Sequence, residues 1–201
     1  MKDLYKLKKP EAISYNRQND IRPFEDASKL ERWCKKMDMS LFLFGSHNKK
    51  RPDNLVFGRL HDYNMLDMIE FGIDQFHSMA SFKNSKVLAQ TKPCLLFAGE
   101  EFADQTNLEM QRIKNYFIDF FRGVETDSVR LAGIEHVLQF TSLDKKVMIR
   151  SYRVMMKKSG QRTPRHKDLY NTFVIDVVIL FFKYIYRVIK KLVFVFYTGA
   201  L

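Results

Sequence analysis

Residues 41–45 run Leu-Phe-Leu-Phe-Gly, four apolar side chains in succession closed by a glycine. A short continuous apolar run predicts a β-strand buried on both faces, of the type found in parallel or mixed sheets. The same pattern returns at 94–99 as Cys-Leu-Leu-Phe-Ala-Gly. This echo is compatible with a domain built from two similar halves.

Two helices are predicted between and after these strands. The first shows apolar residues at helical spacing over 27–37, and Ser28 with Glu31 has the spacing of a capping box. The second covers 107–121, with Thr106 and Glu109 as its predicted capping box and Gly123 as its stop. Its expected apolar stripe consists of Ile113, Tyr116, Phe117, Phe120 and Phe121.

The remaining segments give weaker patterns. Residues 54–60 indicate another strand, and 137–141 with 147–156 indicate two paired strands joined by a turn at 143–146. The stretch 61–82 fits neither the helical nor the strand period. Because strands and helices interleave, we predict an α/β (α+β) fold with a mixed sheet.

The composition points to an anionic partner. The chain has 201 residues and a formal net charge of +11, from 34 Lys+Arg against 23 Asp+Glu. Such an excess of positive charge favours binding to nucleic acid or to an anionic membrane surface. The two cysteines cannot form a disulfide framework, which fits a reducing compartment. The first ten residues lack the apolar core of a secretory signal.

The positive charge is concentrated toward the end of the predicted sheet. Between 145 and 165 there are eight basic residues and no acidic one, whereas 100–127 has seven acidic and three basic residues. Basic residues on a strand also protect sheet edges from aggregation. The absence of compensating acid favours RNA contact instead. The residues predicted to contact RNA here are Arg150, Lys157, Lys158, Arg162 and Arg165.

A second basic segment leaves the strand at 41–45. It reads Gly-Ser-His-Asn-Lys-Lys-Arg-Pro over 45–52 and offers many donors to phosphate and sugar oxygens. It lacks the second glycine and the Gly-Lys-Ser/Thr ending of a nucleotide-binding P-loop. We therefore predict RNA contact, without a nucleotide cofactor, at Ser46, His47, Asn48, Lys49, Lys50 and Arg51.

Several motifs in fixed order resemble the Brix-domain family. They are Phe-Glu-Asp at 24–26, the whole of 41–59, Leu-Asp-Met-Ile-Glu-Phe-Gly at 66–72, Thr-Lys-Pro at 91–93, Phe-Ala-Gly at 97–99, Asp-Phe-Phe-Arg-Gly at 119–123, Arg-Leu-Ala-Gly at 130–133, Arg-Ser-Tyr at 150–152 and Lys-Lys-Ser-Gly-Gln-Arg-Thr-Pro-Arg at 157–165. The second of these motifs adds Arg59 to the predicted RNA-binding residues. The resemblance covers about residues 3–165.

The resemblance implies both a fold and a function. The fold is a Brix domain of two pseudo-repeated halves with mixed sheets and packed helices. The function is large-subunit (60S) ribosome assembly in the nucleolus, through binding of 5S rRNA and pre-rRNA. The implied partners are the regulator of ribosome synthesis protein, ribosomal proteins L5 and L11, and the pre-60S particle.

The resemblance also suggests three segments. We expect a basic, extended N-terminal segment at 1–23, a Brix domain at 24–165 and a divergent apolar and basic tail at 166–201. The second half of the domain is expected to be incomplete, because the family continues into a further strand after Arg165.

The tail has three possible explanations. It could be an amphipathic helix on a membrane, a substitute helix or strand that closes the sheet, or sequence that is not native coding sequence. Its richness in residues of AT-rich codons favours the third. None of its apolar runs approaches the ~20 residues of a membrane-spanning helix.

No pattern indicates an enzyme. The five histidines are scattered, no His/Cys cluster has zinc-site spacing, and no nucleophile accompanies His47. We therefore predict no catalytic residue, metal, cofactor or small-molecule substrate. A protein-interaction scaffold whose basic face docks an acidic partner is the alternative function, as is a truncated isoform without function.

Overall fold

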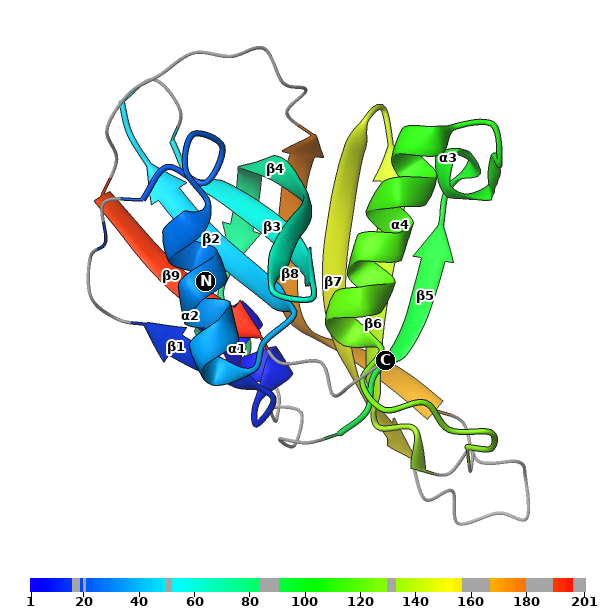
Figure 1. Ribbon diagram of the computed structural model, residues 1–201. Helices are drawn as coiled ribbons and strands as arrows, with labels where there is room; N and C mark the ends of the chain where they lie inside the picture. The colour runs from blue at the N-terminus through cyan, green and yellow to red at the C-terminus, as the bar shows by residue number, and fades with distance from the viewer. Residues whose placement is uncertain are drawn as a thin grey trace, which may run out of the picture. The chain divides into compact units, whose positions relative to one another are not determined.

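A computed structural model of the chain describes residues 1–15, 19, 21–49, 52–83, 91–129, 133–156, 167–179 and 190–196, the last two ranges and 155–156 as backbone. The chain divides into two compact units, Met1–Asp74 with Val177–Leu201, and Gln75–Asp176 (Figure 1). Two units agree with the two-halved domain expected from the sequence.

The first unit is an antiparallel sheet with two helices. Its strands are ordered β1-β9-β2-β3-β4, so a strand from the C-terminal part of the chain lies between two N-terminal strands. The elements are α1 (Lys2–Lys8), β1 (Ala12–Tyr15), α2 (Ser28–Met37), β2 (Leu41–His47), β3 (Asn54–His61), β4 (Asn64–His77) and β9 (Lys190–Phe196).

Strand β2 has both faces covered, as its apolar run predicted. Phe42 and Phe44 are about 1% exposed or less and belong to a cluster with Leu30 and Cys34 of α2. Gly45 faces the other side of the sheet, where the Met1 side chain lies so close that an added Cβ would be 3.0 Å from its Cγ. Burial on two faces explains why β2 has no polar alternation.

The expected capping box of α2 is wrong. Its N-cap is Ala27, and the Ser28 backbone N–H donates to the Asp26 carboxylate at 2.9 Å. Glu31 instead accepts a hydrogen bond from the Met65 backbone N–H at 2.9 Å. The carboxylate therefore ties α2 to β4 and does not close the helix onto its own first turn.

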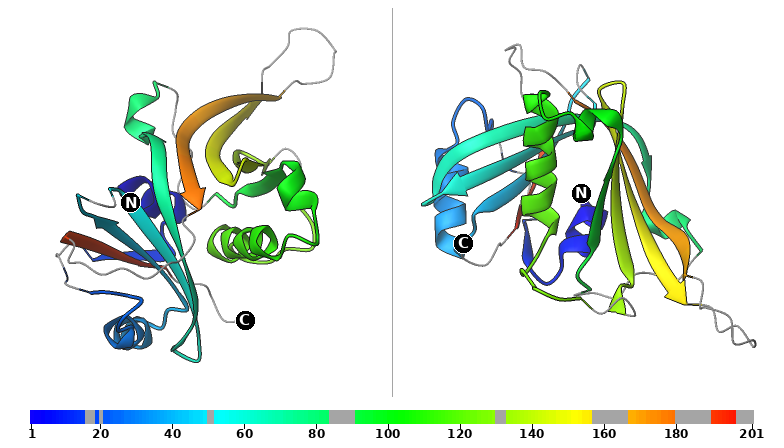
Figure 2. Two further views of the ribbon diagram at one scale, coloured as in Figure 1. Left: turned by 90° about the horizontal axis from the view of Figure 1, so that it is seen from above. Right: turned by 90° about the vertical axis from the view of Figure 1, so that its right-hand side faces the viewer.

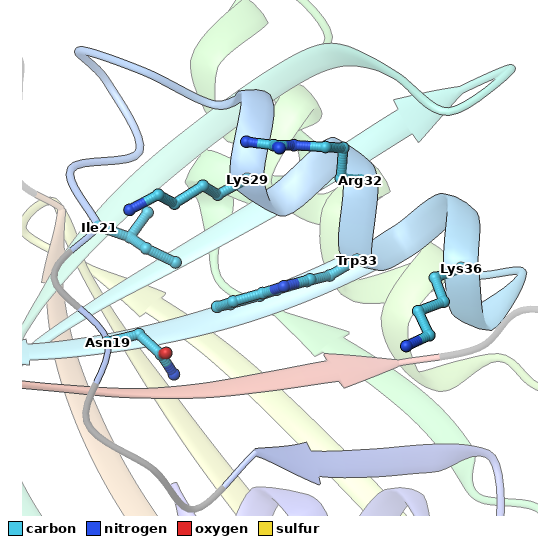
Figure 3. Close-up of a pocket in the computed structure, with 6 residues that line it drawn as sticks. All are labelled: Asn19, Ile21, Lys29, Arg32, Trp33 and Lys36. Atoms are coloured by element: carbon cyan, nitrogen blue, oxygen red, sulfur yellow. The ribbon is translucent and has the colours of Figure 1, made fainter.

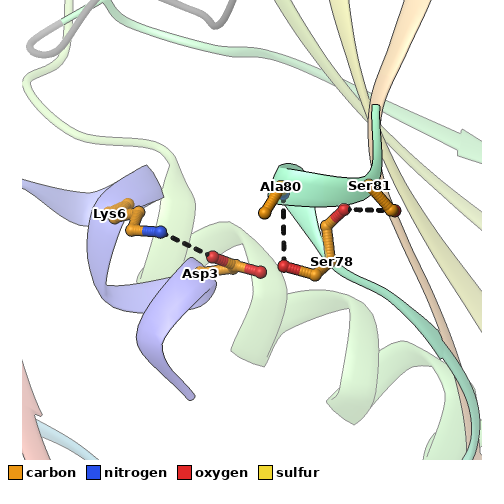
Figure 4. A network of polar contacts seen from close by, with 5 residues as sticks. All are labelled: Asp3, Lys6, Ser78, Ala80 and Ser81. Carbon is orange, nitrogen blue, oxygen red and sulfur yellow. Dashed lines mark hydrogen bonds and ion pairs between the residues drawn. The ribbon is translucent and has the colours of Figure 1, made fainter. Parts of the chain in front are cut away.

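The N-terminal segment is not extended as expected, since α1 precedes β1. Leu4 is 1% exposed, and the Lys6 ammonium pairs with the Asp3 carboxylate at 3.0 Å across one turn (Figure 4). Pro10 restricts the residue before it, and Lys9 indeed takes the extended conformation that ends α1. The proline therefore limits the helix without preventing it.

The ambiguous stretch after residue 60 is mostly strand. β3 and β4 form a hairpin whose two turn residues, Asp62 and Tyr63, both have positive φ angles of 49° and 59°. Two left-handed residues are the signature of a type I′ turn, which matches the twist of paired strands. Most β4 side chains are half-buried or exposed, so the apolar alternation that identifies a strand is weak there.

The second unit contains a mixed sheet, as predicted. Its strands are ordered β8-β7-β6-β5, with β5 parallel to β6 and β6 antiparallel to β7. The run at 94–98 forms β5, but burial on both faces, which its apolar pattern predicted, is wrong. β5 is last in this strand order, and its side chains are half-buried or exposed. The elements are η1 (Met79–Ser81), β5 (Cys94–Ala98), α3 (Glu100–Ala103), α4 (Leu108–Phe121), β6 (His136–Leu143), β7 (Lys146–Met156) and β8 (Lys167–Ile179).

Ser78 is the N-cap of the short helix η1, and its side-chain hydroxyl accepts a hydrogen bond from the Ala80 N–H at 3.2 Å (Figure 4).

Helix α4 packs along one face of this sheet (Figure 2). The five residues of its predicted apolar stripe are all buried. Its predicted cap is wrong by one position: the side chain of Asn107 accepts from the Met110 N–H at 3.2 Å, while the Thr106 hydroxyl donates to Asp104. Gly123 has a φ of +64°, which suits the predicted stop.

Phe140 of β6 is the centre of the second core. Its ring is fully buried and stacks on Phe97 at 4.9 Å and on Phe117 at 4.6 Å between centroids. Phe121 contacts it from α4 at 5.9 Å. These ring contacts join β5, β6 and α4 into one packed layer.

The tail contributes strands to both sheets in its described parts. β9 pairs with β1 and β2, and β8 lies beside β7. Of the three explanations, the backbone favours a substitute that closes the sheet over a surface helix. No helix in the described ranges is both long and apolar enough to cross a membrane.

Gly58 of β3 is required by the ring opposite it. A Cβ built there would lie 2.0 Å from the Phe42 ring. Gly58→Ala is therefore expected to lower the free energy of unfolding by about 2–3 kcal/mol through overpacking, as measured by urea denaturation. Gly133→Ala, where an added Cβ meets nothing within 4 Å, is the control. In the double variant Gly58→Ala, Phe42→Leu, the smaller side chain should recover part of the stability lost by Gly58→Ala. If the effects of the two single substitutions simply add in the double variant, the clash is contradicted.

Candidate nucleic-acid interface

The loop after β2 holds the first group of predicted RNA-binding residues. β2 ends at His47, and the described chain continues through Asn48 and Lys49 before the gap at Lys50 and Arg51, which lie outside the described residues. Lys49 is exposed and Asn48 is half-buried. The loop thus presents an ammonium group to solvent at the end of a rigid strand.

His47 is oriented by the other end of the same loop. Its Nδ1 lies 2.9 Å from Oδ1 of Asp53, and both side chains are exposed. Asp53 has a φ of +52°, and its carbonyl accepts from the Ile73 N–H at 2.9 Å. The loop therefore begins and ends on side chains that are linked to each other and to the sheet.

Two predicted residues are positioned less favourably for phosphate contact. Ser46 is only 8% exposed and lies opposite Asn54 in the sheet. Arg59 forms a two-point ion pair with Asp67, with Nε–Oδ1 at 2.9 Å and Nη2–Oδ2 at 2.5 Å. The Arg59 charge is already neutralised by a partner on β4. The geometry gives neither residue support as a contact to RNA.

The second basic segment is only partly visible. Arg150 lies on β7, half-buried and opposite Gln139 of β6, and its Nη2 contacts the Met148 sulfur at 3.6 Å. The other four predicted residues of this segment lie outside the described part of the chain: Lys157, Lys158, Arg162 and Arg165. Arg150 belongs to the second unit, whereas the loop after β2 belongs to the first.

Helix α2 carries cations that the sequence analysis missed. Its buried residues Leu30 and Cys34 face the sheet. Its exposed side bears four basic residues: Lys29, Arg32, Lys35 and Lys36. The signal was present in the helical period, because basic residues fill the positions between the apolar ones that were used to predict the helix.

Two potentially reactive side chains, Cys34 and His136, are buried and neutral. Burial raises the pKa of the Cys34 thiol to about 12, with a smaller contribution from Glu31, so the thiol stays protonated. Burial lowers the pKa of His136 to about 4, against a smaller opposing effect of a hydrogen bond with the Thr91 backbone. No cluster of three or more His, Cys, Asp or Glu within the described ranges could hold a metal ion.

Comparison with known proteins places the fold in a family. The Brix domain matches residues 1–191. The chain belongs to the Brix-domain family. Relatives named ribosome production factor 2 homolog are 56% identical in Mus musculus and 55% identical in Homo sapiens, each over 165 residues. These matches cover 82% of this chain and 53% of each relative.

The Brix-domain match ends at residue 191 and so extends past residue 165, where the sequence resemblance ended. A homolog of the same name in Oryza sativa subsp. japonica is 34% identical over 196 residues, 94% of this chain and 63% of that protein. The chain spans about half the length of the mammalian relatives it matches. The Brix-domain match includes α1 and β1, and it extends into the range of β9.

Proposed function

We propose that this chain takes part in assembly of the large ribosomal subunit by binding ribosomal RNA, and that it acts as a scaffold without catalysis. Membership of the Brix-domain family and the name of its relatives, ribosome production factor 2 homolog, support a role in ribosome production. The proposed ligands are 5S rRNA and pre-rRNA in the pre-60S particle. The proposed location is the nucleolus.

The observation that carries RNA binding is the loop after β2. A strand with both faces buried ends in a polar segment whose exposed Lys49 leads directly into Lys50 and Arg51. Three successive cations in the segment that follows this strand can neutralise neighbouring phosphates. The protein partners proposed beside RNA are the regulator of ribosome synthesis protein and ribosomal proteins L5 and L11.

Salt dependence of RNA binding tests this loop. Each phosphate contact to single-stranded RNA contributes about 0.7 to the slope of log affinity against log salt. The triple variant Lys49→Ala, Lys50→Ala, Arg51→Ala is expected to flatten the slope by about 2, and Lys49→Ala alone by about 0.7. The slope is measured by filter retention of 5S rRNA between 50 and 200 mM salt, because affinity changes strongly with salt over this range.

The matched control is Lys83→Ala, which removes the same charge from another exposed lysine. Its slope should equal that of the unaltered chain. Equal slopes for the Lys49 variant and the unaltered chain would remove the loop from the interface. A chain that fails to retain rRNA at low salt, yet binds poly-glutamate, would instead be a scaffold for an acidic partner.

A further inference from the structure

A hollow of about 440 Å³ lies beside α2 in the first unit. Its lining combines one aromatic ring, three cations and the segment before the helix. Figure 3 shows Lys29, Arg32 and the Trp33 ring extending from α2 toward that segment, with Lys36 farther along the helix. The lining residues are Asn19, Ile21, Lys29, Arg32, Trp33 and Lys36.

The aromatic ring is held in place from two sides. Trp33 stacks on Tyr15 of β1, with ring centroids 5.3 Å apart and planes 13° from parallel. It also packs against the apolar cluster beneath α2, yet it stays only half-buried and lines the hollow. The indole therefore offers a planar apolar surface that is already held in place before a ligand binds, so binding loses little side-chain entropy.

The cations are arranged along one side of the helix. Lys29, Arg32 and Lys36 are exposed, and seven residues of helix separate the first from the last by about 10.5 Å. Arg32 donates one hydrogen bond from Nε to the Ser28 carbonyl at 3.3 Å, which leaves the outer guanidinium nitrogens for a ligand. Within the described residues, no carboxylate lies within 4 Å of these three charges.

We propose that this hollow, the Trp33 pocket, is a nucleotide subsite for single-stranded RNA. A base packs against the exposed part of the Trp33 indole, and the flanking phosphates contact Lys29, Arg32 and Lys36. Base–aromatic stacking beside a cationic groove is the common way in which proteins hold unpaired nucleotides. The inference rests on the proposed function but concerns a surface separate from the loop after β2.

An acidic peptide matches the pocket less well than RNA does. Its carboxylates could meet the cations, but they bring no planar group for the indole at their centre. A nucleotide supplies a flat base and a charged phosphate within one repeating unit, and it therefore uses both parts of the lining.

The pocket contains its own optical probe. Trp33 is the only tryptophan in the chain, so its fluorescence reports on this site alone. Titrating the full chain with a single-stranded oligoadenylate decamer at 50 mM salt is expected to quench the emission. Poly-glutamate of equal charge is expected to leave the emission nearly unchanged.

Neighbouring lysines provide a matched pair of variants. Lys36→Ala removes a charge from the Trp33 pocket, whereas Lys35 does not line that pocket. Lys35→Ala removes a charge from a neighbouring hollow, which shares Arg32 with the pocket and also contains Glu31 and Asp62. The Lys36 variant should flatten the salt slope of decamer binding by about 0.7, and the Lys35 variant should not change it. Trp33→Leu should weaken decamer binding about 5- to 150-fold, measured by filter retention. Unaltered circular dichroism would show that the variant is folded.

The outcomes separate the two proposals. If the chain retains RNA but the emission does not respond and the two lysine variants have equal slopes, the Trp33 pocket is excluded while the loop after β2 remains. If poly-glutamate quenches the Trp33 emission and the RNA decamer does not, the pocket binds an acidic protein. If the chain retains no RNA at all, the proposed function itself is wrong.

Discussion

Phe140→Ala is expected to lower the free energy of unfolding by about 3–5 kcal/mol, the usual cost of emptying a buried phenylalanine site. The ring is fully buried and touches the rings of Phe97, Phe117 and Phe121, so its loss leaves a cavity that three rigid neighbours cannot fill. Urea denaturation followed by circular dichroism measures the change.

Leu96→Ala is the matched control for that experiment. Leu96 lies on β5 beside Phe97, but its side chain is 46% exposed. Its truncation should change the unfolding free energy by about 0.5 kcal/mol or less. A loss of under about 1 kcal/mol for Phe140→Ala would show that the second core is not packed around this ring.

Acidification is expected to remove about 3 kcal/mol of stability through His136. The pKa of a histidine is near 6.5 in an unfolded chain, whereas burial lowers that of His136 to about 4 in the folded one. Between these pH values the unfolded chain binds more protons, so stability falls as the pH falls. The contribution of neutral His136 is fully present above about pH 6.5 and is lost as the pH drops to 4.

Urea denaturation at pH 7 and pH 4.5 tests this dependence. Neutral His136 shares a hydrogen bond of 2.9 Å with the Ser151 hydroxyl, and the glutamine of His136→Gln can keep a polar partner there without titrating. The variant should lose less stability than the unaltered chain between the two pH values. The exposed His61→Gln is the control, and a profile for His136→Gln parallel to the unaltered one would contradict the assignment.

The parts of the fold that could be predicted are those with a strong local signal. The apolar run at 41–44 identified β2 because both faces of that strand are covered. The stripe of α4 identified its buried face because the helical period is carried by large side chains. Both signals depend on burial, but apolar composition alone does not ensure it, because the similar run at 94–98 forms a strand whose side chains are half-buried or exposed.

The errors lie where tertiary contacts override a local pattern. Glu31 has the spacing of a capping box but is engaged by the backbone of Met65, more than thirty positions along the chain. The helix α1 depends on burial of Leu4, and the neighbouring residues show no local pattern that predicts this burial. β4 lacked a clear period because a half-exposed strand does not require alternating apolar residues.

The candidate site shows the same limits. The sequence located Lys49 and its neighbours because a run of charge is visible without a structure. It could not show that Asp67 neutralises Arg59, since that pair forms across a hairpin. The cations of α2 were overlooked because the helix was analysed for its buried side, although the same period places Lys29, Arg32 and Lys36 together.

The insertion of β9 between β1 and β2 has a consequence for biosynthesis. The first 74 residues are synthesised long before residue 190. Until β9 has been synthesised, the edges of β1 and β2 that pair with it in the complete first unit remain unpaired. The second unit is one continuous segment, Gln75–Asp176, and can fold during this interval. Exposed strand edges attract other chains, which makes this interval the period of greatest need for a molecular chaperone.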